Sequence, residues 1–137
     1  PSQYTLTYNY PLGTACEGSG LLSVVGIILG EGESCTANST CVEDATFGHT
    51  TACGTFPTNL GTGVVQITNE GSTECNVSTA NVTWNALNKC TPAYQEYSCS
   101  ALGVPNLANF TDDTCGTTIA STDYFGYDGK YRYAFVC

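Results

Sequence analysis

The chain has 137 residues, and only 11% of them are charged, whereas ordinary soluble domains carry about a quarter charged residues. Twelve acidic residues stand against Lys89, Lys130 and Arg132, which gives a formal net charge of −9. So few basic residues cannot form the cationic face that nucleic acid or an anionic membrane surface requires. The longest apolar run, residues 21–29, is too short to cross a bilayer as a helix. We therefore predict no nucleic-acid partner and no membrane insertion.

Alternation of apolar and polar residues predicts that the chain is built from strands. The first strand is expected within residues 1–15, where Tyr4, Leu6, Tyr8 and Tyr10 fall on one face. Residues 21–29 are rich in β-branched side chains and predict a strand buried on both faces. Gly26 within it would mark a bulge or a close approach of the backbone. Further strands are expected at residues 64–68, 81–86, 94–99 and 117–122.

Two segments near the C-terminus carry turn and loop signals. Residues 124–137 contain Asp128-Gly129 between two aromatic runs, which predicts a hairpin with a two-residue turn. Residues 101–113 contain Gly103 and Pro105 and predict an exposed loop. About eight short strands separated by turn residues indicate an all-β fold, a β-sandwich or a jelly-roll-like domain. We predict one domain at residues 16–137, stapled by disulfides and preceded by an extended arm at residues 1–15.

Nine cysteines are scattered along the chain. They are Cys16, Cys35, Cys41, Cys53, Cys75, Cys90, Cys99, Cys115 and Cys137. The chain contains no C-x-x-C and only one histidine, so it predicts disulfides and no metal site. Four disulfides leave one cysteine free or bonded to another chain, and the sequence does not assign the pairing. Cys16, the first cysteine, and Cys137, the last residue, are the candidates for an intermolecular link.

Four N-x-[ST] triplets are candidate N-glycosylation sites, at Asn38, Asn76, Asn81 and Asn109. N-glycans are added in a secretory pathway that also oxidises thiols, so the triplets and the cysteines point to the same compartment. The sequence therefore predicts a secreted, extracellular N-glycoprotein. Covalent glycans are expected, and no cofactor.

Candidate catalytic groups are few. His49 is the one side chain whose ordinary pKa lies near neutrality, and the simplest interpretation is a hydrogen-bonded loop histidine. The acidic pairs Glu31/Glu33, Glu43/Asp44 and Asp112/Asp113 are the candidates for glycoside hydrolysis. The candidate oxygen ligands for calcium are Asp112, Asp113, Asp123 and Asp128. Nothing in the sequence brings two pairs around a cleft, and no calcium-loop motif is present. We predict no enzyme, no catalytic residue and no metal.

The expected strand edges suggest assembly. Soluble β proteins protect their edges with lysine, inward-pointing charges or proline, whereas the strands expected here carry few charges. The arm of residues 1–15 can reach roughly 50 Å at about 3.3 Å per residue. Two pairings are open: a first strand within its own domain, or a strand donated to a neighbouring copy through Tyr4, Leu6, Tyr8 and Tyr10. A head-to-tail contact of this kind need not close and yields a filament.

The sequons, the scattered cysteines and the richness in Thr, Asn, Gly and Tyr extend over the whole chain. In this composition the chain resembles the glycosylated, cysteine-rich subunits of extracellular filaments and hairs of aquatic microbes, although no specific motif carries the resemblance. It implies a structural role without catalysis. The predicted function is a structural subunit of an extracellular filament or coat, with copies of itself as partners. The alternative is a secreted carbohydrate-binding or host-interaction module that uses Trp84 and exposed tyrosines; a hydrolase ranks third.

Overall fold

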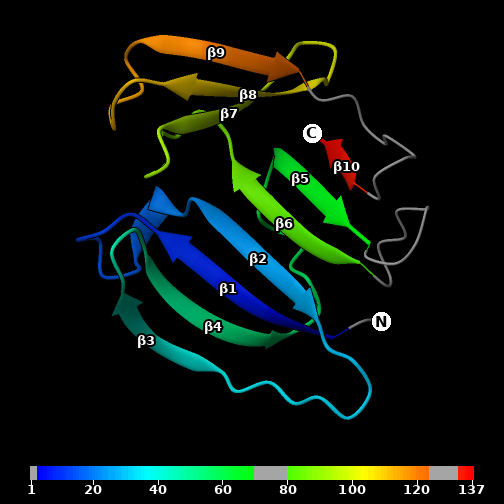
Figure 1. Ribbon diagram of the computed structural model, residues 1–137. Helices are drawn as coiled ribbons and strands as arrows, with labels where there is room; N and C mark the ends of the chain where they lie inside the picture. The colour runs from blue at the N-terminus through cyan, green and yellow to red at the C-terminus, as the bar shows by residue number, and fades with distance from the viewer. Residues whose placement is uncertain (1–2, 70–79, 124–132) are drawn as a thin grey trace.

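The fold contains two antiparallel β-sheets, as shown by a computed structural model that describes residues 3–69, 80–123 and 133–137 (Figure 1). The larger sheet has seven strands in the order β10-β5-β6-β2-β1-β4-β3, and the smaller has three in the order β7-β8-β9. The strands are β1 Tyr4–Tyr10, β2 Ser23–Ile28, β3 Asn38–Glu43, β4 Gly48–Gly54, β5 Gly63–Thr68, β6 Asn81–Ala86, β7 Gln95–Cys99, β8 Pro105–Phe110, β9 Thr118–Asp123 and β10 Tyr133–Val136. The only helical turn among the described residues is the 3-10 turn Gly18–Gly20. The all-β, disulfide-stapled prediction is confirmed.

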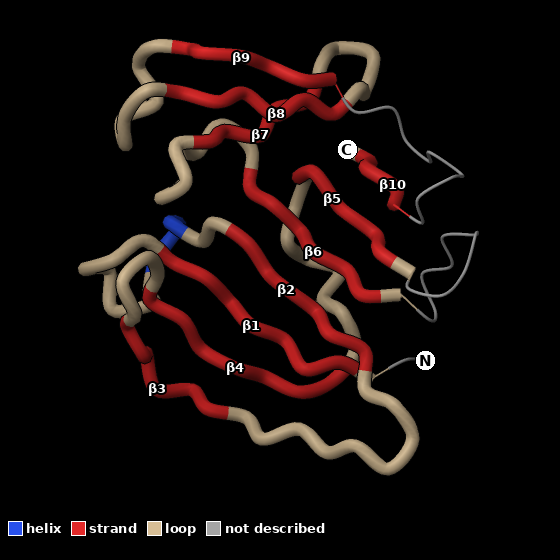
Figure 2. Tube along the Cα trace, in the orientation of Figure 1, coloured by secondary structure: helices blue, strands red, loops and turns tan. Residues whose placement is uncertain are grey.

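The apolar core lies on one face of the seven-stranded sheet. Tyr4, Leu6, Val24, Val82 and Trp84 are all buried there, and the register places Val24 opposite Trp84. The connection from β4 to β5, residues 55–62, crosses this face behind the sheet in the view of Figure 2. The strands therefore bury their apolar residues beneath a loop as well as against one another.

Gly26 marks the place where this loop comes closest to the sheet. A Cβ atom at Gly26 would lie 2.8 Å from the Phe56 ring, which packs edge-on against Tyr4 with ring centroids 5.9 Å apart. The predicted close approach at Gly26 is confirmed. The prediction that residues 21–29 are buried on both faces is wrong, because only alternate residues of β2 are buried and Ile27 is 49% exposed. The β-branched run reflects strand propensity as well as burial.

The opposite face of the large sheet carries hydroxyl and amide side chains. Thr7 of β1 lies opposite Thr51 of β4 and Val25 of β2, and Val25 lies opposite Thr83 of β6. These residues are half-buried, as expected for the middle of a sheet face. The period-two pattern of the sequence thus separates an apolar core face from a face rich in threonine.

The three-stranded sheet contains a strand that the sequence analysis missed. Residues 101–113 were predicted to form an exposed loop, but β8 occupies Pro105–Phe110 and buries Pro105, Leu107 and Phe110. Proline is accepted at the first position of a strand, so it did not exclude this one. Strands β3 and β4 were also not predicted. In Figure 1 β9 lies furthest from the large sheet.

The C-terminal strand β10 pairs with β5, with Tyr133 opposite Thr68 and Val136 opposite Val65. The predicted Asp128-Gly129 turn and the first arm of that hairpin lie outside the described residues. Nowhere in the described ranges is there a helix long and apolar enough to cross a membrane.

Candidate functional site

Four disulfides join eight of the nine cysteines. They are Cys16–Cys41, Cys35–Cys53, Cys90–Cys115 and Cys99–Cys137, and the ninth cysteine, Cys75, lies outside the described residues. Four disulfides indicate an oxidising environment of the kind found outside the cell.

The proposed intermolecular roles of Cys16 and Cys137 are wrong in this structure. The turns after β1 bring Cys16 to β3, with its Cα 5.6 Å from that of Cys41. Cys137 follows β10 and reaches the end of β7, where its Cα lies 6.0 Å from that of Cys99. Position in the sequence suggested exposure, but sheet pairing places both residues beside partners of their own chain.

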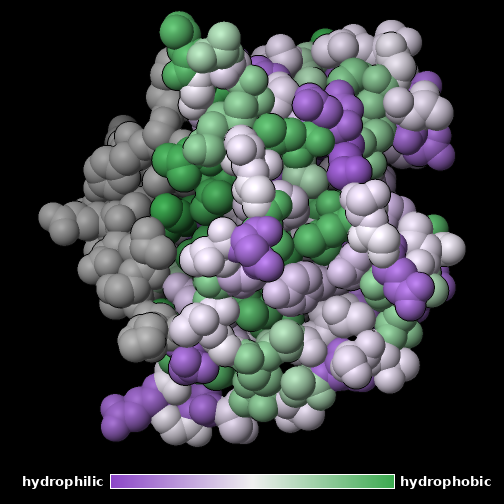
Figure 3. Space-filling view, turned by 180° about the vertical axis from the view of Figure 1, so that it is seen from behind, coloured by the Kyte–Doolittle hydropathy of each residue, from purple (hydrophilic) through white to green (hydrophobic). Residues whose placement is uncertain are grey.

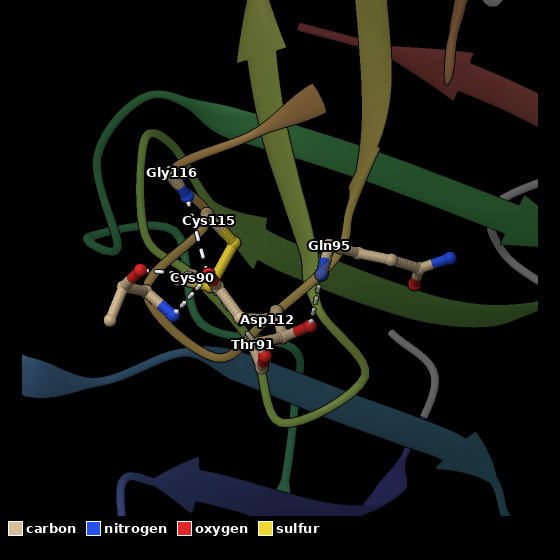
Figure 4. Close-up of a disulfide and its surroundings, with 7 residues drawn as sticks. Cys90, Thr91, Gln95, Asp112, Cys115 and Gly116 are labelled. Carbon is tan, nitrogen blue, oxygen red and sulfur yellow. Dashed lines mark hydrogen bonds between the residues drawn. A yellow bond between two sulfur atoms is a disulfide. The ribbon is translucent and has the colours of Figure 1, made fainter. Parts of the chain in front are cut away.

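The loop between β8 and β9 is fixed by a disulfide and an aspartate (Figure 4). Asp112 Oδ1 accepts hydrogen bonds from Thr114 Oγ1 at 2.7 Å, from Thr114 N at 3.1 Å and from Gly116 N at 3.5 Å. These bonds, with that from the Thr114 hydroxyl strongest, hold the pKa of Asp112 below its usual value. Its neighbour Asp113 is exposed in the same turn, and of the pair Asp112 has the structural role.

Asp44 stabilises a similar turn before β4. Its Oδ1 accepts hydrogen bonds from Thr46 N at 2.7 Å and Phe47 N at 2.8 Å, and these backbone bonds lower the pKa of Asp44. His49 Nδ1 lies 3.7 Å from Asp44 Oδ2. The prediction of a loop position for His49 is wrong, because His49 lies in β4, and its contact with Asp44 leaves the carboxylate committed to the turn.

These two turns predict a loss of stability in acid. Because the pKa of Asp44 and of Asp112 is lower in the folded chain than the ordinary 3.8, both carboxylates stabilise the fold at pH values above 3.8. Their contribution disappears as the pH falls from about 4 through the lower folded pKa values. In Asp44→Asn/Asp112→Asn, the decline of the thermal midpoint between pH 4 and 2 should become shallower. Asp113→Asn is the control for charge, and an unchanged slope in the double variant would contradict this account.

Three of the four sequons lie in strands, and the fourth, Asn76, lies outside the described residues. In each case the side-chain oxygen of the asparagine accepts a hydrogen bond within the fold. Asn38 Oδ1 accepts from Thr40 N at 3.0 Å, Asn81 Oδ1 from Ile28 N at 2.9 Å and Asn109 Oδ1 from Gln95 Nε2 at 2.9 Å. The Nδ2 atom, which would carry a glycan, donates to no partner among the described residues. Glycosylation at Asn38, Asn76, Asn81 and Asn109 stays a prediction.

The arm that contains Tyr4, Leu6, Tyr8 and Tyr10 forms β1 in the middle of the large sheet. It pairs with β2 on one side and with β4 on the other. Tyr4 and Leu6 are buried in the core, and Tyr8 and Tyr10 are half-buried. Of the two pairings that the sequence left open, the structure therefore has the one within the chain.

Two of the other strand edges are already closed or irregular. The register of β3 against β4 shifts between Asn38 and Val42, and β3 is also held by the Cys16–Cys41 disulfide. The outer side of β7 is occupied by a parallel bridge between Leu87 and Tyr97, where Asn88 N donates to Tyr97 O at 2.8 Å. Bulges and occupied edges both discourage the addition of another strand.

The edge strand β9 is different, because all six of its residues are exposed. Among the described strands it pairs with β8 alone, and its sequence Thr-Ile-Ala-Ser-Thr-Asp has no charge before Asp123. Ile119 is 66% exposed, and the β9 residues on both faces of the sheet are exposed. The sequence of this segment predicts a strand. It does not predict that the residues on both faces of the strand are exposed.

Trp84 offers no exposed ring to a sugar. Trp84 is 7% exposed, and its Nε1 donates to the carbonyl oxygen of Gly61 at 3.2 Å. A surface hollow of about 320 Å³ is lined largely by apolar side chains, including Phe56, Leu60 and Ile67. In the rear view of Figure 3 apolar side chains gather near the middle of the visible face. This hollow offers a sugar few polar partners.

The described residues contain no group of three or more His, Cys, Asp or Glu side chains placed to hold a metal ion. No protein-family model, curated protein or solved structure matches the chain. The edge of β9 that no described strand covers is the candidate site.

Proposed function

We propose that the protein is a structural subunit of an extracellular, glycosylated filament or coat, and that it assembles by contacts between sheet edges. The observation that carries the proposal is β9, an edge strand exposed at all six positions and uncharged before its last residue. An exposed edge of this kind is a template for pairing with another chain, and monomeric proteins usually block it. Copies of the same chain are the partners that a structural subunit meets at high local concentration.

Two further features support an extracellular structural role. The four disulfides close loops over residues 16–53 and 90–137, and they suit a protein exposed to proteases and mechanical load. N-glycans on the sequons would supply hydration to a surface that has few charged residues. Secretion and glycosylation belong to the same proposal.

Assembly should depend on ionic strength. A net charge of −9 makes the copies repel one another, and salt shortens the range of that repulsion from about 30 Å at 0.01 M to about 8 Å at 0.15 M. We expect sedimentation velocity to show larger species at 0.15 M salt than at 0.01 M, and negative-stain electron microscopy to show ordered polymers.

The control is the same protein after mild reduction and alkylation, which should lose its fold and form no ordered polymer. A single monomer peak at every salt concentration, even in concentrated samples, would contradict assembly. If that monomer bound oligosaccharides, the carbohydrate-binding alternative would replace the proposal.

A further inference from the structure

We infer that the first contact in assembly is a two-fold pairing between β9 of one copy and β9 of a second copy, antiparallel and centred on Ser121. A two-fold contact closes as a dimer, so a filament or coat would grow from that dimer through a second contact. This inference rests on the proposed function and specifies its partner strand and its register. The pairing would join two three-stranded sheets into one continuous six-stranded sheet.

The direction of pairing follows from the single charge in β9. In a parallel arrangement in register, the two copies of Asp123 would lie beside each other, and like charges opposite one another destabilise a sheet. An antiparallel arrangement moves the two carboxylates to opposite ends of the joint. Asp123 Oδ1 also accepts a hydrogen bond of 2.7 Å from Asn106 Nδ2, so the carboxylate is held over its own sheet.

The register follows from the irregularity in β9. Ala120 lies opposite Asn109 and Thr118 lies opposite Phe110, so Ile119 is the extra residue at a bulge. From Ala120 to Asp123 the pairing with β8 is regular. In a two-fold joint, the residue on the axis lies opposite the same residue of the second copy. With Ser121 on the axis, the centre of the joint lies within the regular segment. Ala120 then lies opposite Thr122 of the second copy, and Ile119 lies opposite Asp123.

Two features of the described residues suit this joint. Side chains stand roughly perpendicular to the sheet, so a glycan on Asn109 of β8 would leave from a face and not from the edge of β9. Five of the six β9 residues are uncharged, so the edge brings few carboxylates together in a protein of net charge −9. No other strand with fully described side chains combines a free edge with exposure at every position.

A charge-swap experiment tests the pairing. In Ala120→Lys/Thr122→Lys, lysines of the two copies would face each other twice across the joint, and we expect the dissociation constant of the dimer to rise by about tenfold or more. Ala120→Glu/Thr122→Glu should behave likewise, and an equimolar mixture of the two variants should form heterodimers at least as tight as the native dimer. Both positions are exposed, so circular dichroism should show an unchanged fold.

The matched control is Val42→Lys/Leu102→Lys, which adds the same charge at exposed positions outside β9 and should dimerise normally. Ser121→Cys tests the register, because directly opposed residues have Cα atoms about 4.5–5.5 Å apart, within disulfide reach. It should give a covalent dimer on a non-reducing gel, and Leu102→Cys should not. Normal assembly by the lysine variant would overturn the β9 pairing and leave the proposed function standing. A native protein that stays monomeric would overturn both.

Discussion

Trp84→Ala is expected to lower the free energy of unfolding by about 3–5 kcal/mol, the usual cost of removing a large aromatic side chain from a core. Trp84 is buried between cross-strand neighbours, with Val24 of β2 on one side and Val65 of β5 on the other. The substitution would leave a cavity at the centre of the large sheet. It would also leave the carbonyl oxygen of Gly61 without the indole N–H that it accepts. Urea unfolding followed by circular dichroism measures the loss.

Trp84→Phe is the matched control for the hydrogen bond. It keeps an aromatic ring in the core but removes the Nε1–H donor, so it should cost clearly less than the alanine variant. Gly63 sets the other boundary of this site, because a Cβ there would collide with the indole and with the carbonyl oxygen of Asn85. Equal stability of the alanine variant and the native protein would show that Trp84 does not fill the core.

Loss of the Cys99–Cys137 disulfide should have an effect of similar size. The bond closes a loop between residues 38 positions apart, and limiting the unfolded chain over such a loop contributes about 3–4 kcal/mol. It also joins the end of β7 in the small sheet to the residue that follows β10 in the large sheet. Cys99→Ala/Cys137→Ala should therefore unfold at a lower urea concentration, measured by the fluorescence of Trp84, the single tryptophan of the chain.

A comparison with Cys35→Ala/Cys53→Ala separates loop closure from the link between sheets. That disulfide spans 18 positions, so loop closure alone predicts a slightly smaller loss. It connects β4 to the loop before β3 within one sheet, so the small sheet should keep its hydrogen-exchange protection in this variant. A Cys99→Ala/Cys137→Ala variant as stable as the native chain would show that the two sheets are held without the bond.

Local pattern predicted most of the strands of this fold. Tyr4–Tyr10 and Asn81–Ala86 alternate clearly, and the structure gives both strands these limits. Strands β3 and β4 were missed because Asn, Ser, Thr, Gly and Cys dominate them and apolar side chains do not mark a face. Gly103 and Pro105 are typical of a loop, so the local pattern does not predict β8, whereas Pro105 begins this strand.

Local sequence patterns do not predict contacts between residues that are far apart in the chain. The nine cysteines allow many pairings, and only the sheet order shows that Cys99 and Cys137 meet. The candidate site could not be predicted for the same reason. The sequence predicts a strand at residues 117–122, but the position of that strand at the edge of the small sheet depends on its pairing with β8. The alternation in residues 1–15 fits a strand donated to another copy and a strand within its own sheet equally well. The structure shows the second arrangement, with β1 paired to β2 and β4.

The central position of β1 also sets the order in which the chain can complete its folding. The pairing of β1 with β2 is local, since Asn9 lies opposite Ser23, but its pairing with β4 brings together Tyr4 and Gly54. During synthesis one side of the first strand must wait until residue 54 has left the ribosome. For that interval its main-chain groups are open to other nascent chains, so this strand is where faulty association would begin.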